Sequence, residues 1–421
     1  MTLRAILFAF TADLIPLYAI YALLFADHGL NAAQISSLFA IWSATSFLLE
    51  IPSGAWADTV SRRGLLILSG ALLTAGFACW TLFPSYLGFA AGFVLWGTSG
   101  ALRSGTFEAL IYDDLHARAA TAEYARLTGR TRAASESAAL AGILAAAPLY
   151  AWGGYALVAW SSILMATLHT LAAITLPDAP KSVSAADVEE LEEVDDLEAA
   201  DDLDEPDDAA GSPARAIGYL AMLRAGLREA LHVRVIRRGV ILVALLNGLT
   251  AFDEYFALLA HHAGAGPSYA AALVALTVAG SLAGSALAGR FEGMRARTMS
   301  IALATAGVLF LGGSLLAGAA THHPTSMYPL TAVGFSAIAI AYGINYNADI
   351  IAAARLQDTI TGPARATVTS VGGFATELVA LLVFLYAAAA TPWLPLALIV
   401  ATLGTPLLLA AALTPTWLPK R

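Results

Sequence analysis

The sequence predicts an all-α polytopic membrane protein, with twelve transmembrane helices in two six-helix bundles related by a pseudo-twofold repeat. Three observations predict this class. Of the 421 residues, 58% are hydrophobic and 13% are charged, against about 25% charged in ordinary soluble domains. The apolar residues gather in runs of roughly 20, which is the length of a helix that spans a bilayer. Short patterns in the first half of the chain recur 233 residues later.

The apolar runs do not alternate in character, as the strands of a membrane β-barrel would. The first run is of spanning length and has no convincing small-residue cleavage site after it, so we interpret it as a retained helix. We expect twelve spans near residues 4–26, 33–56, 64–82, 86–112, 127–150, 154–177, 237–262, 268–290, 298–320, 327–352, 366–389 and 393–416.

The distribution of arginine predicts the orientation of these spans. The gaps near residues 27–32, 83–85, 151–153, 263–267, 321–326 and 390–392 contain no lysine or arginine. Basic residues lie near the other ends, and cytoplasmic loops are enriched in such residues. We therefore expect a multi-pass protein of the inner (plasma) membrane with both termini in the cytoplasm. The basic residues at the expected inner ends are Arg62, Arg63, Arg118, Arg126, Arg130, Arg295, Arg297, Arg355 and Arg365.

One connection is long and acidic. Residues 178–213 hold fifteen acidic residues and one lysine, a net charge of −14, whereas the whole chain has −9 and the remainder therefore +5. Repulsion within this segment favours a solvated linker, with cation or partner binding as the alternative. The residues after it have the pattern of a basic amphipathic helix on the membrane surface. We expect an N-terminal bundle over 1–177, a cytoplasmic linker with this helix over 178–236 and a C-terminal bundle over 237–421.

The two halves repeat each other. Thr128, Arg132 and Ser137 open the fifth span, and Thr361, Arg365 and Ser370 open the eleventh, each 233 residues later. The same offset relates Arg62 to Arg295, and Asp13 falls one residue short of this relation to Asn247. A parallel six-plus-six repeat is typical of transporters whose halves are related by an axis along the membrane normal.

The segment GAWADTVSRRG, at residues 54–64, resembles motif A of the major facilitator superfamily, although Thr59 and Ser61 depart from that motif. The length, the repeat and the central linker agree with this family over nearly the whole chain. The resemblance implies the fold of that family and a secondary transporter that works by alternating access. The residues that carry it are Gly54, Asp58, Arg62 and Arg63.

In the family, the motif implies a cytoplasmic gate. Asp58 would face the positive N-terminal end of the eleventh span. Arg62 could pair with an acid at the end of the fourth span, where Asp113 and Asp114 are available. The alternative is that these charges only fix the topology. The second-half copy, GRFEGMRAR, keeps Glu292 and Arg295 but loses the glycine-aspartate frame, so we expect a weaker gate contact there.

Charge at membrane depth is costly and usually faces a cavity. The third, ninth and twelfth spans carry no charged side chain at depth, whereas other spans carry acids, an arginine and polar stripes at helical spacing. Pro16 predicts a local kink in the first span. The residues predicted to line a proton or substrate pathway are Asp13, Tyr21, Arg103, Glu136, Asn247, Asp253, Glu254, Asn345, Asp349 and Glu377.

Asp13, Glu136 and Glu377 lie about nine to twelve residues into their spans, which places them roughly 15 Å deep, near the midplane. Burial favours the neutral form of a carboxyl group, so these three are candidate proton carriers, with Asp13 and Glu377 first. Arg132 lies one turn before Glu136 and could pair with it. For each acid the alternative is a structural hydrogen bond between helices.

These observations predict a proton-coupled secondary transporter, most simply a proton antiporter for the efflux of a small organic or drug-like compound. Proton-coupled uptake of a nutrient or metabolite is the alternative, and a non-transporting receptor or scaffold is a remote one. The family's exporter motifs are not matched around Arg103 or Pro148. No nucleophile with its base, phosphate loop or metal-ligand spacing is found, so we expect no enzyme activity and no cofactor or metal. The expected partners are the substrate, protons and the lipid bilayer, without nucleic acid, and the expected state is a monomer.

Overall fold

The computed structural model describes residues 1–180, 233–360 and 365–419. Within these ranges the chain is helical with short connections and contains no strand. The predicted acidic linker and the basic amphipathic helix that follows it fall almost entirely on residues 181–232, outside the described residues.

The first described range forms the N-terminal bundle. Its helices are α1 (Thr2–Asp13), η1 (Pro16–Ala19), α2 (Tyr21–Asp27), α3 (Ala32–Thr59), α4 (Arg62–Leu82), α5 (Tyr86–Arg103), α6 (Thr106–Ala117), η2 (Thr121–Glu123) and α7 (Tyr124–Thr175). Polar caps fix where several of them begin. Asn31 and Gln34 form reciprocal side-chain to backbone hydrogen bonds of 2.9 and 3.0 Å at the start of α3. Ser61 and Ser85 accept from backbone N–H groups at the starts of α4 and α5.

The other two ranges form the C-terminal bundle. Its helices are α10 (Arg234–Gly248), η3 (Leu249–Tyr255), α11 (Phe256–His262), α12 (Pro267–Phe291), α13 (Ala296–Ala319), η4 (Ala320–His322), η5 (Pro324–Ser326), α14 (Met327–Thr359), α15 (Arg365–Ala390), α16 (Leu396–Leu403) and α17 (Thr405–Trp417). The predicted span boundaries agree with these helices to within a few residues, except at the end of the tenth span.

The described helices can account for the twelve predicted crossings. Among the described residues, ten helical segments are long and apolar enough to cross a membrane, and one of them is 50 residues long. That segment belongs to α7, which folds back at Gly153 and Gly154, where the backbone leaves helical geometry and Gly154 takes a φ of 59°. α7 therefore crosses twice, and the pair α5 and α6 supplies the remaining crossing.

The fourth span is not the single helix that was predicted. Residues 86–112 were expected to form a single helix, but α5 ends at Arg103 and α6 begins at Thr106. Gly105 between them has a φ of 69°, in the left-handed region that favours glycine. The side chain of Ser104 donates a 2.8 Å hydrogen bond to Glu50 of α3 at this break. The predicted kink at Pro16 is confirmed, because α1 ends at Asp13 and a 3₁₀ turn begins at the proline.

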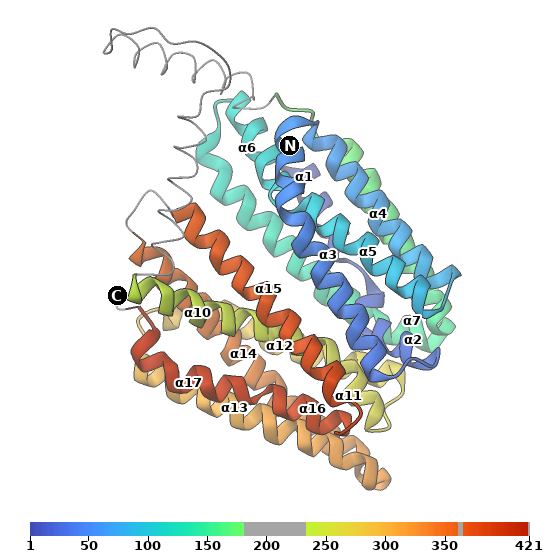
Figure 1. Cartoon of the computed structure of the whole chain (residues 1–421). Coiled ribbons are helices and arrows are strands. Elements are labelled where there is room, and N and C mark those ends of the chain that lie inside the picture. Colours follow the sequence, from blue (N-terminus) through green and yellow to red (C-terminus); the bar gives the residue numbers. More distant parts are fainter. Residues whose placement is uncertain (181–232, 361–364, 420–421) are drawn as a thin grey trace, which may run out of the picture.

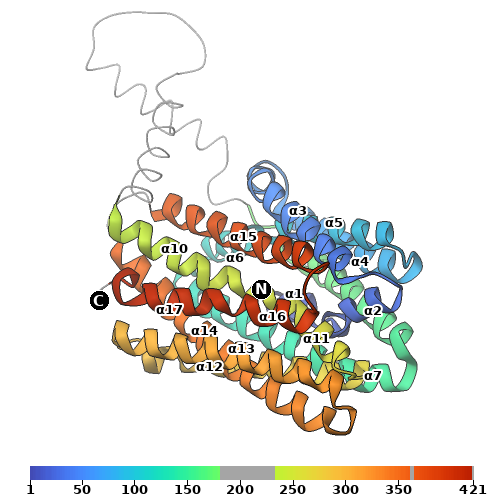
Figure 2. The ribbon, with the colours of Figure 1, turned by 60° about the horizontal axis from the view of Figure 1, so that its bottom comes forward.

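The helices form two bundles, blue to green for the N-terminal half and yellow to red for the C-terminal half (Figures 1 and 2). α3 packs against α15 and α7 against α12, so these pairs join the bundles. We call the end of the molecule where Met1, Val60 and Trp417 lie the termini side, and the opposite end the far side. In Figure 1 the bundles meet where α2 and α11 are labelled and diverge toward the two chain ends.

The buried apolar residues have the same asymmetry. One large core cluster combines both bundles and includes Tyr21, Phe39, Tyr255 and Phe384, which lie in the middle and far-side parts of their helices. On the termini side, each bundle has separate clusters, such as the one around Phe8 in the N-terminal bundle and the one around Met299 in the C-terminal bundle. The two bundles therefore share their core on the far side and have separate cores on the termini side.

Candidate functional site

The centre of the interface between the bundles is marked by a contact between the first and seventh spans. The Tyr21 hydroxyl donates a hydrogen bond to the Glu254 carboxylate, and the two residues are 233 positions apart. This is the offset that relates the two halves of the sequence, as from Thr128 to Thr361. Two residues that are related by a twofold axis and touch each other must lie on either side of that axis. The Tyr21–Glu254 contact therefore lies at the pseudo-twofold axis.

Both spans lose their α-helical form near this contact. The 3₁₀ turn η1 begins at Pro16, and η3 begins at Leu249, again 233 residues later. Broken helices are tolerated at membrane depth only where other groups satisfy the freed backbone. The N–H of Leu17 accordingly donates to the Ser162 hydroxyl at 3.0 Å. The break in η3 brings two consecutive acids, Asp253 and Glu254, to the interface.

These two acids are held in different directions. Asp253 accepts a 2.5 Å hydrogen bond from the Tyr342 hydroxyl of α14, within its own bundle, whereas Glu254 accepts from Tyr21 of the other bundle. Both line a cavity of about 240 Å³ together with Tyr18 and Trp96. Two neighbouring carboxylates in a site of low dielectric repel each other, so the site favours a bound proton or a cation.

Aromatic rings form much of the wall of this central cavity. Tyr18 and Trp96 line it and stack with ring centroids 5.1 Å apart, and Trp42, which lines a neighbouring cavity, stacks on the same indole at 4.8 Å. Tyr342 also lines the cavity and contacts Tyr346 at 4.9 Å. Aromatic faces attract cations, most strongly where water is excluded. Carboxylates beside such rings are a chemistry suited to an organic cation.

A second cavity, of about 160 Å³, adjoins the acid pair. It is lined by Asp253, Glu254, Asn247 and Glu377 among other residues. Glu377 of α15 accepts a 3.1 Å hydrogen bond from Ser43 of α3, which joins the two bundles. Four of the residues that were predicted to line a pathway therefore surround one space between the bundles.

Asn247 also reaches the tenth span. Its amide donates a 3.1 Å hydrogen bond to Asp349 Oδ2, whereas Asp349 Oδ1 has no hydrogen-bond partner among the residues that the structure describes. Asn345 lies differently, because it is fully buried and its amide donates to the Leu246 carbonyl at 2.9 Å. It joins α14 to α10 and does not line either of the two central cavities.

Two further pathway candidates lie in a separate cavity within the N-terminal bundle. This space of about 390 Å³ is lined by Asp13 and Arg103, with Glu108 and Arg132 also contributing. Asp13 accepts a hydrogen bond from the Ser135 hydroxyl. Because the cavity contains both a carboxylate and a guanidinium, it differs from the acidic space between the bundles.

The predicted pair on α7 is present. Arg132 Nε lies 3.2 Å from Glu136 Oε1, and the side chains are 80% and 46% exposed. Both side chains therefore lie outside the packed core of the N-terminal bundle.

The far side is closed by contacts between the bundles, with Asp27 held by a further bond from its own bundle. Tyr255 donates a 2.8 Å hydrogen bond to Ser36. His261 Nε2 lies 3.8 Å from Asp27 Oδ1, and the Tyr155 hydroxyl donates to Asp27 Oδ2 at 2.7 Å. We infer from these contacts, and from the separate cores on the termini side, that the structure represents a state closed on the far side and open on the termini side.

The residues of the motif at 54–64 lie at the termini-side ends of α3 and α4. Arg62 forms an ion pair with Asp113 of α6, and Asp113 is 2% exposed. The Arg63 guanidinium donates to the Ile174 carbonyl at the end of α7. Both contacts are within the N-terminal bundle. The pairing of Arg62 with an acid near the end of the fourth span is therefore present, and its role in a gate stays a prediction.

The structure describes only some of the other residues that were predicted to form the gate. Gly54 and Asp58 lie within α3, but the structure describes only the helix at these two positions and not their surroundings. Residues 361–364, before α15, fall outside the described residues. Glu292 and Arg295 lie in the connection between α12 and α13, and both are exposed. The Arg355 guanidinium donates to the carbonyls of Glu292 and Met294, each at 2.7 Å, and so holds this connection against α14.

Sequence reasoning missed part of the site. The aromatic wall of Tyr18, Trp42 and Trp96 was not selected, because an aromatic residue in an apolar run gives no sign that it faces a cavity. Ser43 and Ser135 were missed for the same reason, since serine is ordinary in membrane helices. The acids that these hydroxyls contact were found, because charge at membrane depth is a strong signal.

The comparisons with known proteins agree with this arrangement. The sequence profile of the Major Facilitator Superfamily matches residues 3–383. This chain belongs to the Major Facilitator Superfamily. It is therefore a transporter of a small-molecule substrate and not an enzyme. A search of curated proteins finds no match.

Solved structures of superfamily transporters share the fold over almost the whole chain. The nucleoside transporter NupG is 11% identical, with a TM-score of 0.70 and coverage of 100% of this chain and 98% of that one. A POT family transporter in complex with a thioalcohol-conjugated peptide is 12% identical, with a TM-score of 0.67 and coverages of 97% and 94%. A bacterial homologue of the human lysosomal transporter Spinster, in an inward-facing and unoccupied conformation, is 16% identical, with a TM-score of 0.64 and coverages of 98% and 95%. At these identities the likeness shows the fold alone.

Proposed function

We propose that this superfamily member is a proton-coupled secondary transporter that exports a small organic cation by alternating access. The observation that carries the proposal is the pair Asp253 and Glu254, which lies at the pseudo-twofold axis beside Tyr18, Trp96 and Tyr342. A substrate with a positive charge would offset the repulsion of the two carboxylates, and its apolar part would pack on the rings.

Coupling follows from competition for the same carboxylates. A proton and an organic cation each neutralise one negative charge, so binding of one disfavours the other. This competition is what exchange of protons for a cation requires. Glu377 adjoins the acid pair in the neighbouring cavity, and Asp13 lies in the cavity of the N-terminal bundle. We propose these two as the residues that pass protons to and from the site.

The proposed orientation places the termini side in the cytoplasm. The arginines near the ends of the spans gather on that side, as the positive-inside rule requires of cytoplasmic loops. The structure would then correspond to the inward-open state, which accepts substrate from the cytoplasm. Closure on the termini side, with separation of α2 from α11, would give the outward-open state.

The test is transport by the full chain in proteoliposomes with an imposed pH gradient. The probe is ethidium, a planar aromatic cation whose fluorescence reports its concentration. We expect movement that depends on the gradient in the wild type and falls at least tenfold in Asp253→Asn and Glu254→Gln. Glu123→Gln, an exposed acid in η2, is the matched control and should transport normally.

Three outcomes would contradict parts of the proposal. Transport that is indifferent to the gradient in the wild type, together with a silent Asp13→Asn, would overturn proton coupling. Transport driven only toward the termini side would favour uptake, which is the alternative direction. Transport of a neutral nucleoside or peptide, without transport of any cation, would overturn the proposed substrate class. The assignment as a transporter would stand.

A further inference from the structure

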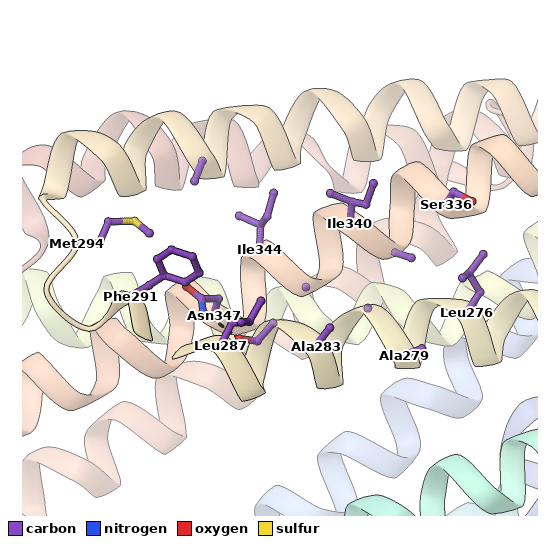
Figure 3. Close-up of a pocket in the computed structure, with 15 residues that line it drawn as sticks. Leu276, Ala279, Ala283, Leu287, Phe291, Met294, Ser336, Ile340, Ile344 and Asn347 are labelled. Carbon is purple, nitrogen blue, oxygen red and sulfur yellow. Dashed lines mark hydrogen bonds between the residues drawn. The ribbon is translucent and has the colours of Figure 1, made fainter. Parts of the chain in front are cut away.

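One cavity lies away from the bundle interface. It is a groove of about 620 Å³ on the C-terminal bundle, with α14 as its floor and α12 and α13 at its sides (Figure 3). The side chains that line it are almost all apolar, and the labelled ones include Leu276, Leu287, Ile340 and Ile344. None of the acids that form the candidate site lines this groove.

The floor of the groove is rigid because α12 and α14 approach each other closely. A Cβ atom added at Gly284 would lie 1.9 Å from the Gly343 carbonyl oxygen, and one added at Gly280 would lie 2.2 Å from that of Ala339. The Asn347 amide also donates to the Gly284 carbonyl at 2.9 Å. The small side chains along this contact leave space above it that neighbouring helices do not fill.

The groove opens toward the bilayer. Ile340 is 56% exposed, Phe291 is 44% exposed and Leu276 is 39% exposed, although all three line it. Along α12 it extends from Leu276 to Phe291, which is roughly 22 Å at 1.5 Å per residue. The hydrocarbon of one leaflet is roughly 15 Å deep. An apolar groove of this length at membrane depth excludes water and is filled by lipid chains.

The termini-side end of the groove carries three exposed arginines and one exposed acid, Glu292, and so has a net positive charge. Arg290 lies in the last turn of α12, seven residues and two helical turns after Ala283, so it continues the same helix face at the end of the groove. Arg295 and Arg297 lie at the start of α13, next to the lining residue Met294, and all three arginines are exposed. The hydrogen bonds from Arg355 hold this connection in place. Basic pockets between transmembrane helices suit anionic headgroups.

We propose that this groove is a binding site for one anionic phospholipid from the termini-side leaflet. One acyl chain lies along α14 between α12 and α13, and the headgroup phosphate contacts Arg290 and Arg297. The charge complementarity at the basic end selects an anionic over a zwitterionic lipid. The site is independent of the transported substrate, because it shares no residue with the cavities between the bundles.

The test is native mass spectrometry of the purified full chain in nanodiscs that contain phosphatidylglycerol and phosphatidylcholine in equal amounts. We expect one retained phosphatidylglycerol per chain, with at least tenfold preference over phosphatidylcholine. Arg290→Gln and Arg297→Gln should each lower this preference about fivefold. Ala283→Trp should fill the groove and abolish retention. Val308→Trp, on an exposed position of α13 that does not line the groove, is the matched control and should retain the lipid.

A second measurement uses only the wild type, so it tests the proposal even if a variant fails to fold. A photoactivatable phosphatidylglycerol, with its reactive group in the acyl chain, should label wild-type peptides that contain residues 276–294 and 336–347. Equal retention of both lipids, labelling spread over all helices, or a groove covered by a second copy of the chain in a stable dimer would each overturn the proposal.

Discussion

Replacement of Tyr21 by phenylalanine tests the role of the axis contact in closing the far side. The substitution removes one hydroxyl and keeps the ring, which is 3% exposed and packs against Phe25 and Trp80. The hydroxyl donates to Glu254 of the other bundle, so the change removes one hydrogen bond between the bundles and leaves the apolar core intact.

The size of the effect follows from the contact. Hydrogen bonds between transmembrane helices average about 0.6 kcal/mol and reach about 1.7 kcal/mol. Because this bond reaches a half-buried carboxyl group, we expect about 1 kcal/mol, somewhat above that average. Since about 1.4 kcal/mol corresponds to a tenfold change in an equilibrium, the ratio of far-side-closed to far-side-open molecules should fall about fivefold.

The assay is a distance measurement between spin labels on the two bundles. Cys79 is the only cysteine of the chain, so Cys79→Ser gives a background for labelling. Phe83→Cys and Thr325→Cys place labels at exposed far-side positions, one on each bundle. The longer distance, from the far-side-open state, should gain population in Tyr21→Phe.

The control is Tyr86→Phe, which removes a hydroxyl that lies 2.9 Å from Ser37 within the N-terminal bundle. It should leave the distance distribution unchanged. Equal distributions in the wild type and Tyr21→Phe would refute the reasoning that this contact holds the far side closed. An equal shift in both variants would show that the loss of any tyrosine hydroxyl loosens the protein.

Three further substitutions test the packing by thermal unfolding of the purified protein. Asp113→Asn should lower the free energy of unfolding by about 3 kcal/mol, because it breaks a largely buried ion pair, whereas Arg132→Gln, at an ion pair with two exposed side chains, should cost less than about 1 kcal/mol; equal costs would contradict the assignment. Gly284→Ala should destabilise by about 1–3 kcal/mol through its clash with Gly343, whereas Gly289→Ala, which has open space around it, should not; a neutral Gly284→Ala would show that α12 can move. Gly105→Ala should cost about 1–2 kcal/mol from its positive φ, compared with little for Gly100→Ala, and equal stability would mean that the break between α5 and α6 can straighten.

Hydropathy predicted the spans well, because the requirement to bury every backbone polar group at membrane depth leaves a strong sequence pattern. The kink at Pro16 was predicted for a related reason, since proline cannot complete the helical hydrogen bonds. The break at η3 was not predicted, because residues 249–255 contain neither proline nor glycine. The break at Gly105 was also missed, since an isolated glycine is common in membrane helices.

It was easier to predict from the sequence which residues form the site than which of them contact each other. Tyr21 and Glu254 were both selected from the sequence, yet nothing in either span predicts that they touch. Their contact depends on how the two bundles pack, and a hydrophobic period carries no information about packing between distant spans. The offset of the repeat was informative, because residues 233 apart are equivalent and can meet at the axis. It does not identify which of these pairs lies deep enough in the interface to touch.

The central claim is that Asp253 and Glu254 bind the transported cation, and equilibrium binding tests it most directly. The measurement is titration of the purified wild type and the double variant Asp253→Asn/Glu254→Gln with ethidium and with a neutral aromatic probe of similar size. We predict that the wild type binds the cation at least tenfold more tightly than the neutral probe, releases protons on binding, and loses this preference in the double variant. Unchanged cation affinity in the double variant would contradict the account.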